Sequence, residues 1–168
     1  MSLRRLAGRS AGYGGAVKMI ALQDEWWPDM TCFGCGPANS DGLRLKSYPQ
    51  LDGSVTATFQ PWPQHDNGGG FLNGGVIATL LDCHSAAAVH QEAFLNGWMP
   101  AEGQSLAYVT AGIDVRYRRP APLKEPVTLV ASTKDASEDQ ITAVVRLEWD
   151  GKVRAEGEAL WKRWRPRS

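Results

Sequence analysis

One carboxylate lies within an otherwise apolar stretch of the sequence, just after a glycine-rich bend. The stretch HDNGGGFLNGGVIATLLDCHSAAAV spans residues 65–89, and the carboxylate in its apolar part is Asp82. A carboxylate among apolar groups is costly unless it is paired or functional, and it can act as a nucleophile or a general base. The alternative is an Asp on an exposed side of a helix. Because the surrounding pattern leaves little exposed side, we predict a functional role.

The glycine-rich bend supplies a candidate partner for this carboxylate. Gly75 lies at the predicted start of the helix, where backbone N–H groups lack an intrahelical partner and the helix dipole is positive. An unpaired N–H group there can stabilise the charge that develops on a carbonyl oxygen. Glycine lets that carbonyl approach the backbone closely, so we expect Gly75 to act in catalysis and Gly74 to contact the substrate.

The spacing of these two groups predicts how the site is assembled. Gly75 and Asp82 are seven residues apart, two turns along one helix face, or about 10.5 Å at ~1.5 Å per residue. One reacting carbon cannot lie near both groups of a single chain. If both are catalytic, we expect a homodimer in which one subunit supplies Gly75 and the other supplies Asp82.

The remaining pattern predicts the elements that position this site. Residues 55–59 alternate apolar and polar side chains, as a half-buried strand does, and residues 74–94 are apolar around most of a helix. Alternation returns in four later segments, residues 111–119, 126–133, 140–149 and 152–164, whereas residues 24–50 resemble an irregular lead-in. An antiparallel sheet curled around one helix, the hotdog fold of the α+β class, accommodates this pattern.

Length and charge indicate the domain organisation and argue against two classes of protein. We expect residues 1–22 to form a disordered segment or extension and residues 23–168 to form a single domain. Residues 1–18 are basic and lack acidic side chains; a transit peptide and a start at Met19 both remain open. The body between the basic ends is acidic, which disfavours nucleic-acid binding, and no apolar run approaches the ~20 residues that span a membrane.

Three cysteines are too few for a disulfide framework. Cys32 and Cys35 form a C-x-x-C pair, but a zinc ribbon needs a second pair of ligands, and only Cys83 and three scattered histidines remain. A redox pair is the alternative. We expect reduced, structural cysteines in a cytoplasmic protein, with no metal site and no cofactor.

Four segments resemble the hotdog thioesterases of the phenylacetate-pathway type (PaaI-like). NGGVIATLLD resembles the start of their central helix, NGGGFLNGG their Asn-Gly loop, TAGIDVRYRRPAP their second-strand signature, and CFGCGPANSDGLRL a lead-in common in that group. The resemblance covers residues 32–163. It implies an acyl-CoA thioesterase that releases free acid and CoA from an acyl- or aryl-CoA. It also implies active sites at the interface of a homodimer or of a dimer of dimers.

The resemblance implies roles for three further residues, each with a structural alternative. Asn67 matches the loop Asn that positions the thioester or the water, although Asn-Gly also favours a turn. Asn73 stands where the family motif usually has His; it is a good helix N-cap but cannot shuttle a proton, so binding without hydrolysis is an open alternative. Thr110 matches a strand hydroxyl that lies near the carboxylate.

Substrate contacts are expected from side chains around this site. Arg116, Arg118 and Arg119 could hold the phosphates of CoA, or form a solvated strand face. Ser85 lies on the face of Asp82, and His65 could line the entrance, although an exposed loop His is the simpler expectation. His84 points about 160° from Asp82 and is interpreted as structural. Four tryptophans are expected either to line an acyl or aryl pocket or simply to fill the apolar core: Trp26, Trp27, Trp62 and Trp98.

Overall fold

The computed structural model of the chain describes residues 19–100, 102, 104 and 106–165, so most of the expected N-terminal extension lies outside the described residues. The elements in chain order are α1 (Leu22–Trp26), β1 (Ser47–Pro49), β2 (Val55–Phe59), a short 3₁₀ turn (Pro63–His65), α2 (Gly74–Leu95), β3 (Tyr108–Tyr117), β4 (Val127–Ala136), β5 (Gln140–Trp149) and β6 (Lys152–Arg163). None of the described helices is long and apolar enough to cross a membrane.

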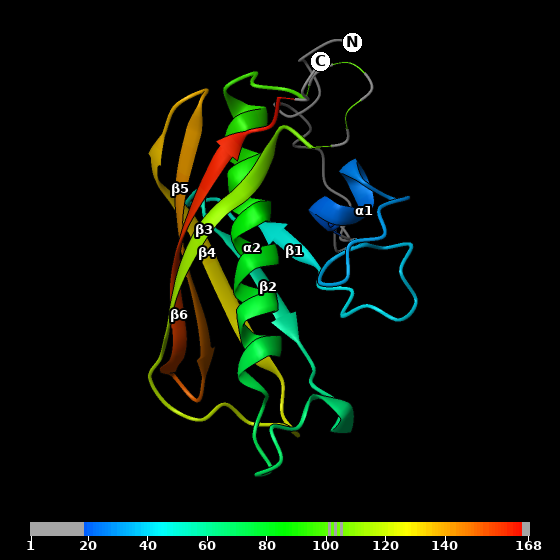
Figure 1. Cartoon of the computed structure of the whole chain (residues 1–168), viewed down its shortest axis with the longest axis vertical. Helices are drawn as coiled ribbons and strands as arrows, with labels where there is room; N and C mark the ends of the chain where they lie inside the picture. The colour runs from blue at the N-terminus through cyan, green and yellow to red at the C-terminus, as the bar shows by residue number, and fades with distance from the viewer. Residues whose placement is uncertain (1–18, 101, 103, 105, 166–168) are drawn as a thin grey trace, which may run out of the picture.

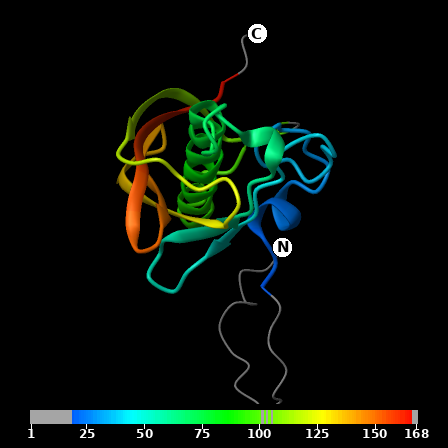
Figure 2. The same ribbon diagram turned by 90° about the horizontal axis from the view of Figure 1, so that it is seen from below.

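The six strands form one antiparallel sheet in the order β1-β2-β4-β5-β6-β3. The sheet curls around α2, which lies along its concave side (Figure 1), and the view along the helix shows the sheet wrapping it (Figure 2). The hotdog architecture predicted from the sequence is therefore confirmed. β3 ends the strand order, so its second edge has no partner strand in the described chain.

The predicted alternation places apolar side chains toward α2. In β4, Val127, Leu129 and Ala131 are buried, and so are Ile141, Ala143, Val145 and Leu147 in β5. These strand residues pack with Leu80, Leu81 and Val89 of α2 in the apolar core. Burial of one helix by one sheet thus explains why the helical segment is apolar around most of its circumference.

A one-residue bulge changes the direction of side chains within β3. Thr110 pairs with Trp161 of β6, but the next paired residue is Gly112, opposite Leu160, so Ala111 is the extra residue. An extra residue reverses the alternation of a strand. As a result Thr110 faces α2 before the bulge, while Ile113 packs on the core after it.

The lead-in contains two elements that the sequence did not predict, α1 and β1. Both are too short to show a hydrophobic period, and side-chain hydrogen bonds hold them instead. The Gln23 amide donates to Ser47 Oγ over 3.0 Å and accepts from the Ser47 N–H over 2.8 Å. Ala21 and Leu22 are also buried, so the packed part of the chain begins slightly before residue 23.

His84 is structural, as its direction on the helix indicated. Its Nε2 lies 3.0 Å from the Val55 carbonyl, so Nε2 carries the proton and Nδ1 accepts from Ser47 Oγ at 2.9 Å. Burial lowers the pKa of His84 to about 4. The side chain therefore links α2 to β1 and β2 in its neutral form.

His90 is the second buried histidine of α2, and its burial makes the stability of the fold sensitive to acid. Burial lowers its pKa to about 4, and Nε2 has no hydrogen-bond partner within the described chain. In the unfolded chain both histidines titrate near 6.5. Between pH 6.5 and 4 the unfolded state therefore binds more protons, and stability falls as the pH is lowered through this window.

We expect urea unfolding at pH 7, 6 and 5 to show this loss of stability. At 1.36 kcal/mol per pKa unit, protonation of the unfolded state lowers the stability by about 2 kcal/mol for each histidine at pH 5, and by about 3 kcal/mol at pH 4. His90→Gln, which cannot titrate, should reduce the pH dependence by about half. Parallel curves for the parent and the variant would contradict this assignment.

Candidate active site

Asn73 caps the start of α2. Its side-chain Oδ1 accepts hydrogen bonds from the N–H groups of Gly75, at 2.8 Å, and Val76, at 3.3 Å. The Gly75 N–H was expected to be unpaired. This expectation is wrong, because the Asn73 side chain at the N-cap accepts a hydrogen bond from it. A substrate carbonyl must share this N–H with Asn73 or displace the Asn73 side chain.

The two glycines at the helix start have different surroundings. A Cβ at Gly75 would meet only Asn73 Oδ1, at 3.1 Å, so the space over Gly75 is otherwise open. Gly74 is covered by Tyr117, whose hydroxyl donates to the Gly74 carbonyl over 2.8 Å. Tyr117 was not predicted as a site residue. It is the last residue of β3, and its hydrogen bond joins the end of this strand to the start of α2.

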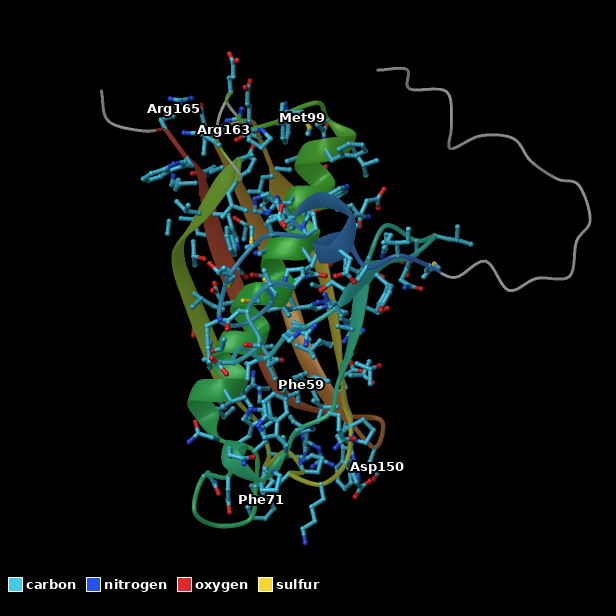
Figure 3. The ribbon with its side chains drawn as sticks, turned by 90° about the vertical axis from the view of Figure 1, so that its right-hand side faces the viewer. Phe59, Phe71, Met99, Asp150, Arg163 and Arg165 are labelled. Carbon is cyan, nitrogen blue, oxygen red and sulfur yellow. The ribbon has the colours of Figure 1, made fainter. Side chains whose placement is uncertain are left out.

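The glycine-rich loop is held by its own side chains. Asn67 Oδ1 accepts from the N–H groups of Gly69, at 2.8 Å, and Phe71, at 3.3 Å. Asp66 Oδ1 binds the N–H groups of Gly68 and Gly70, both at 2.9 Å. The loop lies at one end of the molecule, where Figure 3 labels Phe71, opposite the end that carries Met99. Asn67 therefore has the turn role that was its structural alternative.

Asp82 lies in the middle of α2, half-buried, and faces β3. Thr110 Oγ1 donates a hydrogen bond of 2.8 Å to Asp82 Oδ1, so the structure brings together the two residues that the resemblance paired. Burial raises the pKa of Asp82, while the hydrogen bond from Thr110 opposes the rise and the neighbouring Cys32 adds to it. Oδ2 has no hydrogen-bond partner within the described residues.

Two predicted contact residues have other roles in the structure. Ser85 is fully buried; its hydroxyl donates to the Asp82 carbonyl over 2.8 Å and accepts from Trp161 Nε1 over 3.1 Å. His65 is only 6% exposed and packs against Trp62 and Phe59, so the expectation of an exposed loop histidine is wrong. We therefore propose no substrate contact for Ser85 or His65.

The predicted cations differ in what they contact. Arg116 pairs with Asp114 at 3.5 Å and Arg118 pairs with Glu156, in exposed ion pairs. Arg119 has no ion-pair partner among the residues that the structure describes. Because exposed ion pairs are weak, a CoA phosphate could replace the carboxylate partner of Arg116 or of Arg118. Arg119 could bind a phosphate without breaking an ion pair of the described residues.

Three of the four predicted tryptophans line one cavity. Trp26, Trp27 and Trp98 surround a cavity of about 740 Å³, together with His90 and other residues near the last turns of α2. Trp62 lies elsewhere, against Phe59 and His65. An aromatic pocket is therefore present, near the C-terminal end of α2.

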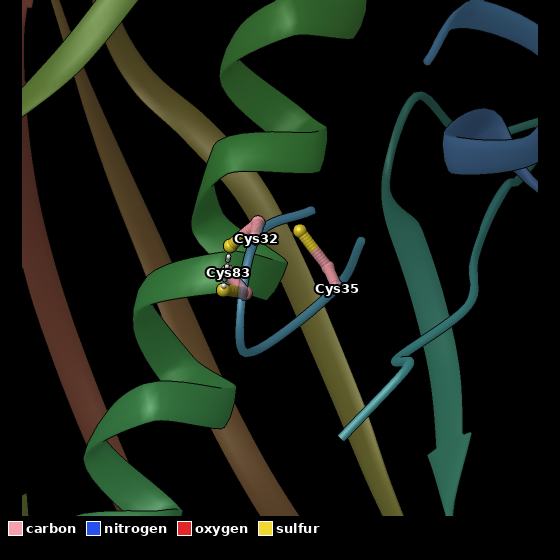
Figure 4. A group of neighbouring side chains, drawn as sticks. All are labelled: Cys32, Cys35 and Cys83. Carbon is pink, nitrogen blue, oxygen red and sulfur yellow. Dashed lines mark hydrogen bonds between the residues drawn. The ribbon is translucent and has the colours of Figure 1, made fainter. Parts of the chain in front are cut away.

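Cys83 of α2 lies beside the C-x-x-C pair, a contact that the sequence does not predict. In the structure the Sγ atoms of Cys32, Cys35 and Cys83 all lie within 4.8 Å of one another (Figure 4). The pair itself was visible in the sequence, but its contact with α2 joins positions 51 residues apart and has no local signal.

Comparison with solved structures supports the fold. A thioesterase superfamily protein from Shewanella loihica is 27% identical, with a TM-score of 0.60 over 76% of this chain and 97% of that one. Zebrafish thioesterase superfamily member 2 is 25% identical, with a TM-score of 0.59 over 75% and 88%. The PaaI protein from the phenylacetic acid degradation operon of E. coli, at 18% identity, shows the same fold, with a TM-score of 0.60 over 73% and 80%.

Sequence comparison identifies the family. A search of curated proteins found no match. The family described as the thioesterase superfamily matches residues 69–159, which include the glycine-rich loop, α2 and most of the following sheet. More than half of the chain is covered, and the chain therefore belongs to the thioesterase superfamily.

Proposed function

We propose that the protein is an acyl-CoA thioesterase that uses Asp82 as its nucleophile or general base. The observation that carries this proposal is the half-buried Asp82 carboxylate, held by Thr110 from β3. Family membership supports the reaction class. The resemblance of the helix-start and loop motifs supports a substrate of the phenylacetate-pathway type, an acyl- or aryl-CoA.

We propose different tasks for the two oxygens of Asp82, because their surroundings differ. Oδ1 accepts from Thr110, which fixes the plane of the carboxylate, and Oδ2 remains available for the substrate or a water. Attack by Oδ2 on the thioester carbon expels the CoA thiolate and leaves an acyl–Asp82 anhydride, which a water then hydrolyses to the free acid and the Asp82 carboxylate. In the alternative, Oδ2 takes a proton from a water that attacks the same carbon, the CoA thiolate is expelled, and the thiolate takes up that proton. Hydrolysis is complete when the acid and the protonated thiol leave.

A second copy of the chain is needed if Gly75 also acts. The seven-residue separation of Gly75 and Asp82 remains about 10.5 Å in the observed helix. β3 offers a ten-residue edge with no partner strand within the described sheet, and such edges readily pair. We propose that two chains associate through β3, so that each site combines Gly75 of one subunit with Asp82 of the other.

One observation favours a second candidate function, acyl-CoA binding without hydrolysis. Asn73 already occupies the Gly75 N–H that would stabilise the oxyanion. If the Asn73 side chain stays in place when a thioester binds, the carbonyl gains little polarisation.

Asn73→Asp separates the capping role of Asn73 from a catalytic one. Asp is as good an N-cap as Asn and its charge suits a helix N-terminus, so the melting temperature should stay equal or rise. A carboxylate cannot donate to the carbonyl and repels the oxyanion, so kcat should fall roughly 10- to 100-fold. Asn73→Ala, which removes the cap, should cost about 1 kcal/mol of stability. Unchanged turnover in Asn73→Asp would restrict Asn73 to capping.

Release of CoA thiol tests the proposed function directly. The full-length protein is mixed with short-chain, long-chain and aromatic acyl-CoAs, and free thiol is followed with a thiol reagent. Multiple turnovers with one class support the thioesterase and name its substrate. Saturable binding of acyl-CoA with no thiol release would favour the binding protein instead.

A further inference from the structure

We propose that Cys32, Cys35 and Cys83 form a binding site for a thiophilic divalent cation, Zn²⁺, that joins the lead-in to α2. This proposal does not rest on the proposed thioester chemistry, although Cys32 neighbours Asp82. The C-x-x-C pair comes from the loop after α1, and Cys83 comes from the middle of α2 (Figure 4).

The distances fit a tetrahedral thiolate site. Cys32 Sγ lies 3.8 Å from Cys83 Sγ, and all three sulfur atoms lie within 4.8 Å of one another. With Zn–S bonds of about 2.3 Å, sulfur atoms in a tetrahedral site are separated by about 3.8 Å. Shifts of about 1 Å or less would therefore seat one ion among the three sulfurs. A disulfide joins only two cysteines, and does not account for a third thiol at the same point.

The C-x-x-C turn is shaped around the first sulfur. The backbone N–H groups of Gly34 and Cys35 lie close enough to the Cys32 thiol to help lower its pKa. The Gly36 N–H closes the turn on the Cys32 carbonyl over 2.9 Å. A Cβ at Gly36 would lie 2.4 Å from the Cys32 nitrogen, so only glycine fits there. Backbone donors that point at sulfur stabilise a thiolate, the form that binds metal.

A second glycine lets this turn rest directly on α2. A Cβ at Gly34 would lie 2.2 Å from Cys83 Sγ and 3.0 Å from the Thr79 methyl group. Any larger residue at position 34 would therefore push the turn away from Cys83. The C-x-x-C turn and α2 therefore lie closest to each other at the three sulfur atoms.

The fourth coordination position is left for water or an added ligand. Asp82 neighbours Cys83 in sequence but is not part of the compact thiol group, and its Oδ1 is engaged by Thr110. The ion would fasten the lead-in to α2 one residue from the carboxylate, without using it as a ligand. Binding releases any protons that remain on the thiols.

Metal content of the purified full-length protein tests this proposal. The protein is prepared under reducing conditions without chelator, and metals are measured by mass spectrometry. We expect about one zinc per chain, and a loss of roughly 90% or more in Cys32→Ser, Cys35→Ser and Cys83→Ser. Asp82→Asn is the matched control: it should keep its zinc even where thioester hydrolysis is lost, which separates this proposal from the proposed function.

A cobalt titration keeps the test valid if the serine variants fold poorly. The parent protein is stripped with a chelator, reduced and titrated with Co²⁺. Thiolate-to-cobalt charge-transfer bands and strong visible bands of a tetrahedral ion, saturating near one equivalent, support the site. Reduced parent protein that takes up neither Zn²⁺ nor Co²⁺ overturns the proposal, as does full metal content in folded Cys83→Ser.

Discussion

Replacement of Asp82 by Asn should abolish CoA release while the fold is kept. Asn has the same shape, and its amide oxygen can still accept the hydrogen bond from Thr110 Oγ1 that Asp82 Oδ1 accepts. Burial raises the pKa of Asp82, which means that the charged form is costly at this place. A neutral amide there should leave the melting temperature equal or higher. It can neither attack the thioester nor take a proton, so we expect kcat to fall on the order of 10³-fold or more.

A matched control is available away from α2 and β3. Asp139 lies in the turn between β4 and β5, is exposed, and makes an exposed ion pair with Arg165. Asp139→Asn removes the same charge and should keep turnover within about twofold, because exposed pairs contribute little. Thiol release and thermal unfolding are measured for both variants. Equal turnover in Asp82→Asn and the parent would remove Asp82 from the chemistry.

Two inactive variants should restore activity when combined in one dimer. Gly75→Val places a side chain in the open space over Gly75, where a Cβ meets only Asn73 Oδ1. The fold should be kept, and the approach of a thioester carbonyl to the N–H should be blocked. Asp82→Asn lacks the carboxylate. In a mixed dimer one site carries both changes, and the other carries both parental residues.

The expected recovery is large and has a defined value. Equal amounts of the two variants, unfolded together and refolded, give about half mixed dimers, so about a quarter of the parental activity should return. Each variant refolded alone should stay inactive, and a sizing column shows the dimer. If no activity returns from folded mixed dimers, the two residues do not act in a shared site. An active monomer would exclude the β3-paired dimer altogether.

Regular alternation made most of the fold predictable from the sequence. The strands of the later half, from β4 to β6, and the long helix α2 are each at least ten residues long, so their periods are unambiguous. The five residues of α1 and the three of β1 carry no period. Their positions depend on the Gln23–Ser47 hydrogen bonds, which no local pattern encodes.

The candidate site was predictable in part for the same reason. Asp82 stood out because a carboxylate interrupts an apolar helix, and the contact with Thr110 followed from the resemblance. Alternation alone places Thr110 on the face opposite Ile113, and only the bulge at Ala111 brings both toward α2. The sequence is compatible with both a capping role and a catalytic role for Asn73, and only the folded geometry shows the hydrogen bond from the Gly75 N–H to its side chain.

β3 holds both ends of the helical segment that carries the site, through Tyr117 on the Gly74 carbonyl and Thr110 on Asp82. Antiparallel strands keep their inward faces only when the pairing shifts by two residues, about 7 Å. In a dimer joined along β3, the gap between Gly75 of one subunit and Asp82 of the other would therefore change in discrete steps. Because one reacting carbon must lie near both groups, a dimer in any other register would have no complete site, so the pairing of the two β3 strands would decide whether the protein is active.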